Sequence, residues 1–261
     1  LGVFSRKNHN LRQFSLLLSG NGGSGGGRVF SPTDLSALVL WLDASRILSI
    51  ADGGAVATWS DLSGLGNDFT EGTNNPSYQT GIINGQPVVR FDGTNDILSR
   101  ADDADFGLTG DFTIFVVFQT TAQTVGLISH YNTGAPYNGW SFSIGINNPT
   151  LGALQCWTNG NAAWASDGTD FTDANFHVAS MTMISGTFQP YRDGTSATSD
   201  AGHSVADSTN VIYLGADGGG TSLAAIDIAE VIVYSDGKLA ANLNQIGQYI
   251  ASKYAITWNV I

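Results

Sequence analysis

Ten short runs rich in β-branched and aromatic residues recur between positions 38 and 234, and polar, glycine-containing segments separate them. The run at 112–120 is apolar at successive positions, which predicts a central strand buried on both faces. The run at 177–184 alternates, so Met181 and Met183 are expected on the face opposite Thr182. The runs are LVLWLD (38–43), AVATW (55–59), PVVRF (87–91), FTIFVVFQT (112–120), VGLISH (125–130), WSFSIGI (140–146), HVASMTMI (177–184), TFQPYRD (187–193), VIYLGA (211–216) and IDIAEVIVY (226–234).

Turn residues between these runs favour hairpin connections. Nine Asp-Gly or Asn-Gly pairs lie within residues 31–261, among them Asn84-Gly85 and Asp193-Gly194. Such pairs supply the positive φ angles that tight hairpin turns require. Many short strands joined in this way predict an all-β fold, an antiparallel sandwich of two sheets.

One helix is expected near the C-terminal end, at about 238–254. Leu239, Leu243, Ile246 and Ile250 recur with the spacing of one helical face. This face should pack on the sandwich.

Residues 1–30 differ from the rest of the chain and predict an extended N-terminal arm ahead of a domain at 31–261. The tract GNGGSGGG (20–27) has the composition of a flexible linker. A short apolar patch on such a linker is useful when it docks into another molecule. The docking residues expected on the arm are the basic Arg6, Lys7 and Arg12 and the apolar Phe14, Leu16, Leu17 and Leu18.

Charge is distributed unevenly between arm and domain. The arm holds four basic residues and no acid, whereas residues 31–261 hold six basic and twenty-two acidic residues, a formal charge of −16. Such a domain repels nucleic acid and anionic membranes, so we expect no nucleic-acid partner. No apolar run approaches the roughly 18 residues of a membrane span, so we expect no membrane insertion. Cys156 is the single cysteine, which excludes an intrachain disulfide.

Six stretches of the chain form a characteristic ordered set. They are LVLWLDAS (38–45), VATWSDLSGLGNDFT (56–70), PVVRFDGTNDILS (87–99), FTIFVVFQT (112–120), YRDG (191–194) and IAEVIVYSDGKLAANLNQIGQYIASKY (228–254). Together they resemble the concanavalin A-like lectin/glucanase superfamily and specifically its laminin-G-like members. The resemblance covers about residues 35–256. It implies a two-sheet jelly roll that binds sugars or proteins, often with calcium, as in secreted bacterial proteins and phage structural proteins.

Catalytic motifs are not evident in the sequence. Glycoside hydrolysis needs two carboxyl groups about 5–9 Å apart across a cleft. The E-x-D-x-E strand of the laminarinase-type relatives has no match, since Glu71 and Glu230 are the only glutamates and lie far apart in the sequence. We interpret Glu230, within an apolar run, as a structural carboxylate, and Cys156 as a buried small side chain. We therefore expect no enzymatic activity.

Calcium is the one cofactor that the residues suggest. FDGTNDIL (91–98) places Asp92, Asn95 and Asp96 on one tight turn, and DLSGLGND (61–68) offers a similar set. Oxygen ligands of these types suit a hard cation. The competing interpretation is that these side chains cap their own turns.

Glycan binding is suggested by aromatic residues among amides and glycines. Sugar C–H faces pack on exposed aromatic rings, and amides bind hydroxyl groups. The competing interpretation is that these rings fill the core. HYNTGAPYNGW (130–140) supplies Tyr131, Tyr137 and Trp140, and WTNGNAAW (157–164) supplies Trp157 and Trp164.

Together these features predict a non-enzymatic virion structural protein that decorates a phage capsid or tail. The arm would anchor it to other virion proteins or to copies of itself, and the outward jelly roll would bind cell-surface glycans. The alternative is a secreted bacterial carbohydrate-binding module, and a second alternative is a glycoside hydrolase.

Overall fold

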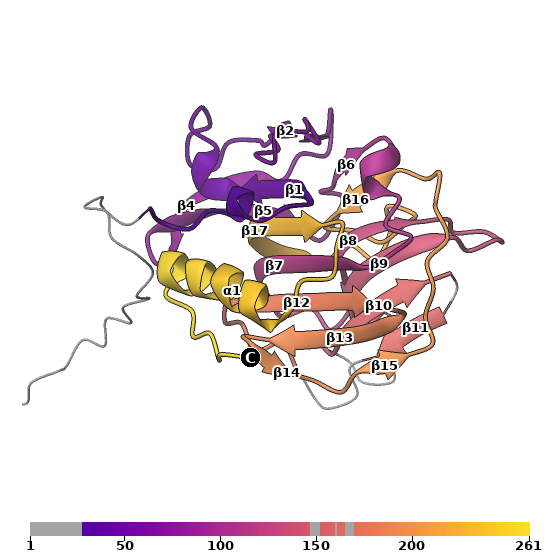
Figure 1. Cartoon of the computed structure of the whole chain (residues 1–261). Helices are drawn as coiled ribbons and strands as arrows, with labels where there is room; N and C mark the ends of the chain where they lie inside the picture. Colours follow the sequence, from indigo (N-terminus) through magenta and orange to yellow (C-terminus); the bar gives the residue numbers. More distant parts are fainter. Residues whose placement is uncertain (1–27, 147–151, 160, 165–169) are drawn as a thin grey trace, which may run out of the picture.

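The protein is a sandwich of two antiparallel β-sheets with one helix on an outer face (Figure 1), in the computed structural model that describes residues 28–146, 152–159, 161–164 and 170–261. This confirms the predicted fold class. The predicted boundary between arm and domain stays a prediction, since residues 1–27 lie outside the described residues. None of the helices in the described ranges is long and apolar enough to cross a bilayer.

The first sheet has nine strands in the order β14-β13-β12-β7-β17-β5-β4, with β1 paired to β17 and β15 paired to β13. Strand β7, the apolar run predicted to be central, lies between β12 and β17. The bounds are β1 Leu38–Asp43, β4 Ser77–Ile83, β5 Gln86–Asp92, β7 Phe112–Thr120, β12 His177–Ile184, β13 Thr187–Arg192, β14 Thr195–Ser196, β15 Asp200–Ala201 and β17 Ala225–Tyr234.

The second sheet has eight strands in the order β11-β10-β9-β8-β16-β6-β3-β2. Two 3-10 turns, η2 Ala44–Arg46 and η3 Ala104–Phe106, connect strands of the two sheets, and a third, η1 Pro32–Asp34, precedes β1. The bounds are β2 Thr58–Trp59, β3 Phe69–Thr70, β6 Leu98–Arg100, β8 Val125–Tyr131, β9 Gly139–Ile144, β10 Leu154–Thr158, β11 Asn161–Trp164 and β16 Ile212–Leu214.

Two apolar layers hold the molecule together. Alternate residues of β7 serve both: Ile114 and Phe118 pack between the sheets, while Phe115 faces the helix side. The alternation predicted for β12 is confirmed, because Met181 and Met183 lie in the core between the sheets.

The helix α1 (Ala240–Tyr254) covers the outer face of the nine-stranded sheet, across β7 and β12 in Figure 1. Leu243, Ile246 and Ile250 are buried there as predicted. The prediction that Leu239 belongs to the buried face of this helix was wrong. It is the N-cap residue with extended φ and ψ, so its side chain lies before the helical stripe and is exposed.

Candidate functional site

Alternating residues give the eight-stranded sheet an apolar inner face and a polar, aromatic outer face. On β9, Phe142 and Ile144 belong to the core, whereas Ser141 lies on the opposite face. On β10, Leu154 and Cys156 are in the core, whereas Gln155 and Trp157 lie on the outer face. The outward side chains of β8, β9 and β10 lie side by side because these strands are neighbours.

A pocket of about 180 Å³ lies on this outer face, and we call it the outer-face pocket. Three of the five aromatic residues predicted to bind glycan meet there: Tyr131 from the end of β8, Tyr137 from the following loop and Trp157 from β10. The complete lining is Tyr131, Thr133, Tyr137, Ser141, Ile146, Gln155, Trp157 and Asp217.

Two residues that line the outer-face pocket each carry a buried polar atom that lacks a hydrogen-bond partner among the described residues. Gln155 is only 1% exposed, yet its Oε1 accepts no hydrogen bond, and Nε1 of Trp157 donates none. A buried polar group left unpaired costs about 1–3 kcal/mol. The acceptor of Gln155 and the donor of Trp157 lie on the same face of one strand, and hydroxyl groups can pair with both types of group because they donate and accept.

Asp217 comes from the loop after β16 and organises that loop. Its Oδ1 accepts hydrogen bonds from the backbone N–H and the hydroxyl of Thr221, at 3.1 and 2.6 Å. The loop lies close to the sheet, because a Cβ atom at Gly126 would lie 2.2 Å from the carbonyl carbon of Ala216. A Cβ atom at Gly218 would lie 2.5 Å from the ring of Tyr131. The wall of the pocket is therefore fixed by close backbone approach.

The electrostatic character of the outer-face pocket is neutral to acidic. Burial and the nearby Asp217 carboxylate raise the pKa of Tyr131 to about 12, so the phenol keeps its proton at neutral pH. No lysine or arginine is among the described lining residues. The pocket can therefore offer hydrogen bonds and aromatic surface, but no cation.

The two other aromatic candidates, Trp140 and Trp164, are not among the described residues that line this pocket. The expectation for Trp140 was wrong, because its ring is fully buried between the sheets, 5.9 Å from that of Phe112. Its position on β9 is one residue before Ser141, and the strand alternation turns it inward. Trp164 pairs with Gln155 in the β10–β11 ladder, and its side chain lies outside the described residues.

The turn that was expected to hold calcium is formed by its own hydrogen bonds. Oδ1 of Asp92 accepts from the backbone N–H groups of Thr94 and Asn95, at 2.7 and 3.2 Å. Oδ2 of Asp96 accepts from the N–H of Asp92, and Asn95 bonds Asn74. These are the hydrogen bonds expected if the side chains cap their own turn, which was the competing interpretation. Calcium binding at this turn stays a prediction.

The second acidic loop is organised in the same way. Asp61 accepts hydrogen bonds from the N–H groups of Trp41 and Asn67. Asp68 accepts the N–H of Asp61. Within the described residues, no cluster of three or more His, Cys, Asp or Glu side chains could hold a metal ion.

Glu230 lies on β17 beneath α1 and is fully buried. Its Oε1 accepts hydrogen bonds from Nε1 of Trp41 at 2.6 Å and from the hydroxyl of Tyr249 at 2.8 Å. Nζ of Lys253 lies 3.0 Å from its Oε2 and 2.6 Å from Oδ2 of Asp43. Burial raises the pKa of Glu230, and Lys253 opposes that rise. The bonds to Tyr249 and Lys253 join the helix to the sheet, and the bond to Trp41 joins β17 to β1, so the carboxylate has a structural role.

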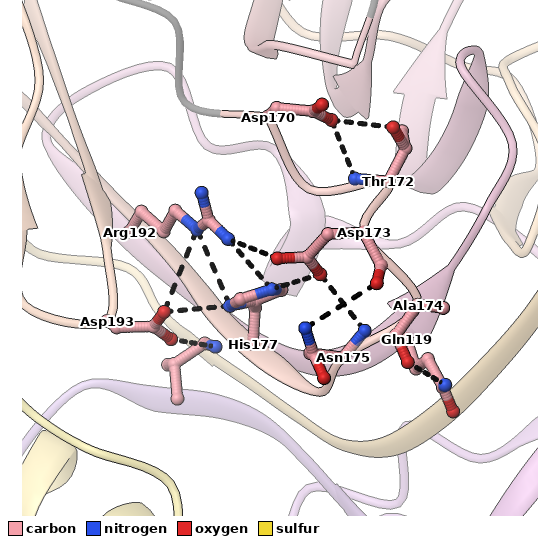
Figure 2. A network of polar contacts seen from close by, with 10 residues as sticks. Gln119, Asp170, Thr172, Asp173, Ala174, Asn175, His177, Arg192 and Asp193 are labelled. Atoms are coloured by element: carbon pink, nitrogen blue, oxygen red, sulfur yellow. Dashed lines mark hydrogen bonds and ion pairs between the residues drawn. The ribbon is translucent and has the colours of Figure 1, made fainter.

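A second charged network fixes the loop before β12 (Figure 2). The ring of His177 lies between two carboxylates, with Nδ1 2.8 Å from Asp193 and Nε2 2.8 Å from Asp173. Nη2 of Arg192 lies 3.0 Å from Asp173, and its guanidinium packs over the ring of Phe171. The network ties the loop at 170–176 to the strands β12 and β13.

The His177 network predicts a pH-dependent stability. Burial lowers the pKa of His177, but the bonds to Asp193 and Asp173 outweigh it, so the pKa is raised above 6.5. The contribution of His177 is therefore complete below about pH 6.5 and is lost as the pH rises through the raised value. We expect the free energy of unfolding to fall across that window, by about 1.4 kcal/mol per unit of pKa shift. Urea denaturation at a series of pH values measures this.

The control for that experiment is His177→Gln, which should flatten the pH dependence over the same window. An NMR titration of the His177 ring gives its pKa directly. A pKa at or below 6.5, or an unchanged slope in the variant, would contradict the assignment.

The arm residues expected to dock into a partner, namely Arg6, Lys7, Arg12, Phe14 and Leu16 to Leu18, lie outside the described residues. The described chain starts at Arg28, which forms an ion pair with Asp34. Phe30 packs against Tyr249 of α1, with ring centroids 6.1 Å apart. The chain therefore enters the domain on the helix side of the nine-stranded sheet, opposite the outer-face pocket.

The fold is shared with several solved structures. The binding domain of Paraclostridial Mosquitocidal Protein 1 aligns with a TM-score of 0.60 at 14% identity, over 83% of this chain and 52% of that one. A Trypanosoma rangeli sialidase aligns with a TM-score of 0.59 at 14% identity, over 91% of this chain and 36% of that one. The binding domain of botulinum neurotoxin serotype D aligns with a TM-score of 0.56 at 14% identity, over 81% and 51%.

This chain thus spans about half or less of the solved chains that it resembles. At these identities the likeness concerns the β-sandwich fold. No protein-family model and no curated protein matches the sequence.

Proposed function

We propose that this protein is a non-enzymatic carbohydrate-binding protein that holds a sugar in the outer-face pocket. The observation that carries the proposal is the meeting of Tyr131, Tyr137 and Trp157 around an unpaired acceptor on Gln155. Aromatic surface with a few oriented polar groups is the usual composition of a small-molecule site. The fold likeness to toxin binding domains is compatible with this function.

The described carboxylates support binding without catalysis. Hydrolysis of a glycoside needs two carboxyl groups across one cleft. Asp217 is the single carboxylate among the described residues of the outer-face pocket. Glu230 is engaged beneath α1, and Oε1 of Glu71 accepts N–H bonds from its own turn.

We further propose that the protein is a virion component that is anchored by its arm, on a phage capsid or tail. Two observations support this. The arm has the composition of a docking segment, with basic residues, an apolar patch and a glycine linker. The chain also enters the domain beside α1, on the face opposite the outer-face pocket, so an anchored domain would direct that pocket outward.

Glycan binding is tested with a glycan array followed by calorimetry on the full chain. We expect Trp157→Ala to weaken binding by about 30-fold, because truncating an aromatic anchor in a pocket costs about 2 kcal/mol or more. Gln155→Ala should weaken it about tenfold, the value of one hydrogen bond. Gln79→Ala, on the other sheet, is the matched control and should bind like the parent chain. Equal binding by all three variants would refute the pocket.

Anchoring by the arm is tested by light scattering after size exclusion, on the full chain and on residues 31–261. We expect the full chain to form a defined oligomer or to bind purified particles, and the truncated chain to stay monomeric and unbound. If both chains behave alike in both assays, the arm is no anchor. The secreted carbohydrate-binding module then becomes the better proposal.

A further inference from the structure

We propose that the outer-face pocket selects an uncharged sugar ring and rejects sugars that carry a carboxylate or a sulfate. The inference rests on the proposed function and adds to it the class of ligand.

All lysine and arginine side chains of the described residues are already paired with carboxylates away from the outer-face pocket. The segments left out within the domain, 147–151, 160 and 165–169, contain no lysine or arginine. A negative ligand group in the pocket would therefore find no cation of this domain. The pairs are Arg28 with Asp34, Arg46 with Asp43, Arg90 with Asp227, Arg100 with Asp103, Arg192 with Asp173, Lys238 with Asp236, and Lys253 with Asp43 and Glu230.

Among the described residues that line the pocket, Asp217 is the one charged group, and its charge has the same sign as that of an acidic sugar. Asp217 is only 8% exposed, and its effect reaches the pocket because it contributes to the raised pKa of Tyr131. Charges at such partly buried positions are weakly screened by salt. A carboxylate placed beside Asp217 would meet repulsion without compensation, and its own burial would add a desolvation cost.

The unpaired groups of the outer-face pocket suit a hydroxyl-bearing ring. Oε1 of Gln155 needs a donor, which a hydroxyl group supplies and a carboxylate cannot. Nε1 of Trp157 needs an acceptor, which the same or the adjacent hydroxyl group supplies. A volume of about 180 Å³ is below the roughly 300–1,000 Å³ of drug-sized sites. The pocket therefore fits one ring, such as the end of a chain.

The test compares sugars that differ by one carboxylate. The ¹⁵N-labelled full chain is titrated with the methyl glycosides of glucose, galactose and mannose, and with the three matching methyl uronides. The signal is the indole N–H of Trp157, one of six tryptophans, which Trp157→Phe identifies by its loss. We expect at least one neutral glycoside to shift this signal, and its uronide to bind at least tenfold more weakly.

Asp217→Asn should narrow the ratio between neutral and acidic affinities, because the amide keeps a carbonyl acceptor for the loop and loses the charge. If the ratio between neutral and acidic affinities is unchanged in Asp217→Asn, Asp217 does not contribute to the discrimination against acidic sugars. A uronide that binds as tightly as its neutral partner would overturn the inference and leave glycan binding standing. If none of the six sugars shifts the Trp157 signal and no glycan on the array binds, both the inference and the proposed function fail.

Discussion

Replacing Lys253 with methionine is expected to lower the free energy of unfolding by about 3–5 kcal/mol, the usual cost of removing one partner from a buried ion pair. The reason is that Lys253 bridges two buried carboxylates, those of Glu230 and Asp43. Asp43 keeps the more distant Arg46 at 3.7 Å, whereas Glu230 has no other cationic partner among the described residues. Methionine fills much of the same volume, so lost packing contributes little. Urea denaturation of both chains, followed by circular dichroism, measures the difference.

Two controls separate charge from packing at this site. Adding Glu230→Gln to Lys253→Met removes one unpaired charge, so the double variant should be more stable than Lys253→Met alone. The loss in Lys253→Met should also shrink in acid, because the buried Glu230, whose pKa is already raised, takes up a proton. If the double variant loses the sum of both single effects at every pH, the cluster is not held by charge.

Replacing Trp140 with alanine is expected to destabilise the protein by about 3–5 kcal/mol, the range for a large aromatic residue in a core. Its ring is fully buried and packs between Phe112 and His130. Its Nε1 also donates to the carbonyl of Phe106 at 3.2 Å, and the truncation leaves that carbonyl with one bond fewer. The measurement is again urea denaturation.

Trp157→Ala is the matched control for Trp140→Ala, because the two tryptophans lie on neighbouring strands with opposite orientation. Trp157 is partly exposed and its Nε1 has no described partner to lose. We expect Trp157→Ala to weaken glycan binding and to cost much less stability than Trp140→Ala. Similar losses of stability in both variants would contradict the assignment of one tryptophan to the core and the other to the pocket.

The sequence predicted those features that depend on local pattern. The apolar run 112–120 is central because side chains on both of its faces are apolar and must be buried. The core between the sheets buries one face, and the layer beneath α1 buries the other. The helix was expected at 238–254 and begins two residues later, at Ala240, because Leu239 serves as the N-cap. Short strands such as β6, at Leu98–Arg100, carry too few residues for their alternation to be recognised.

The site was less predictable because it depends on contacts between distant segments. Tyr131 and Trp157 were found from their composition, but the same criterion selected Trp140, since composition does not report which way a strand turns its side chains. A signal for Gln155 existed, as a polar residue between Leu154 and Cys156 in an apolar strand. Nothing local connects Asp217 with Tyr131, because they meet through the close approach of the loop to the sheet at Gly126 and Gly218.

The position of β17 has a consequence for how the chain is made. This strand, Ala225–Tyr234, pairs with β1, β5 and β7. The hydrogen bond between Trp41 on β1 and Glu230 on β17 joins residues that are 189 positions apart in the sequence. A ribosome therefore releases β1, β5 and β7 long before the strand that joins them is synthesised. The nascent chain carries open strand edges throughout that interval, and such edges favour aggregation. Because folding must wait for these distant pairings, we expect it to be slow and to follow completion of the chain rather than accompany its synthesis.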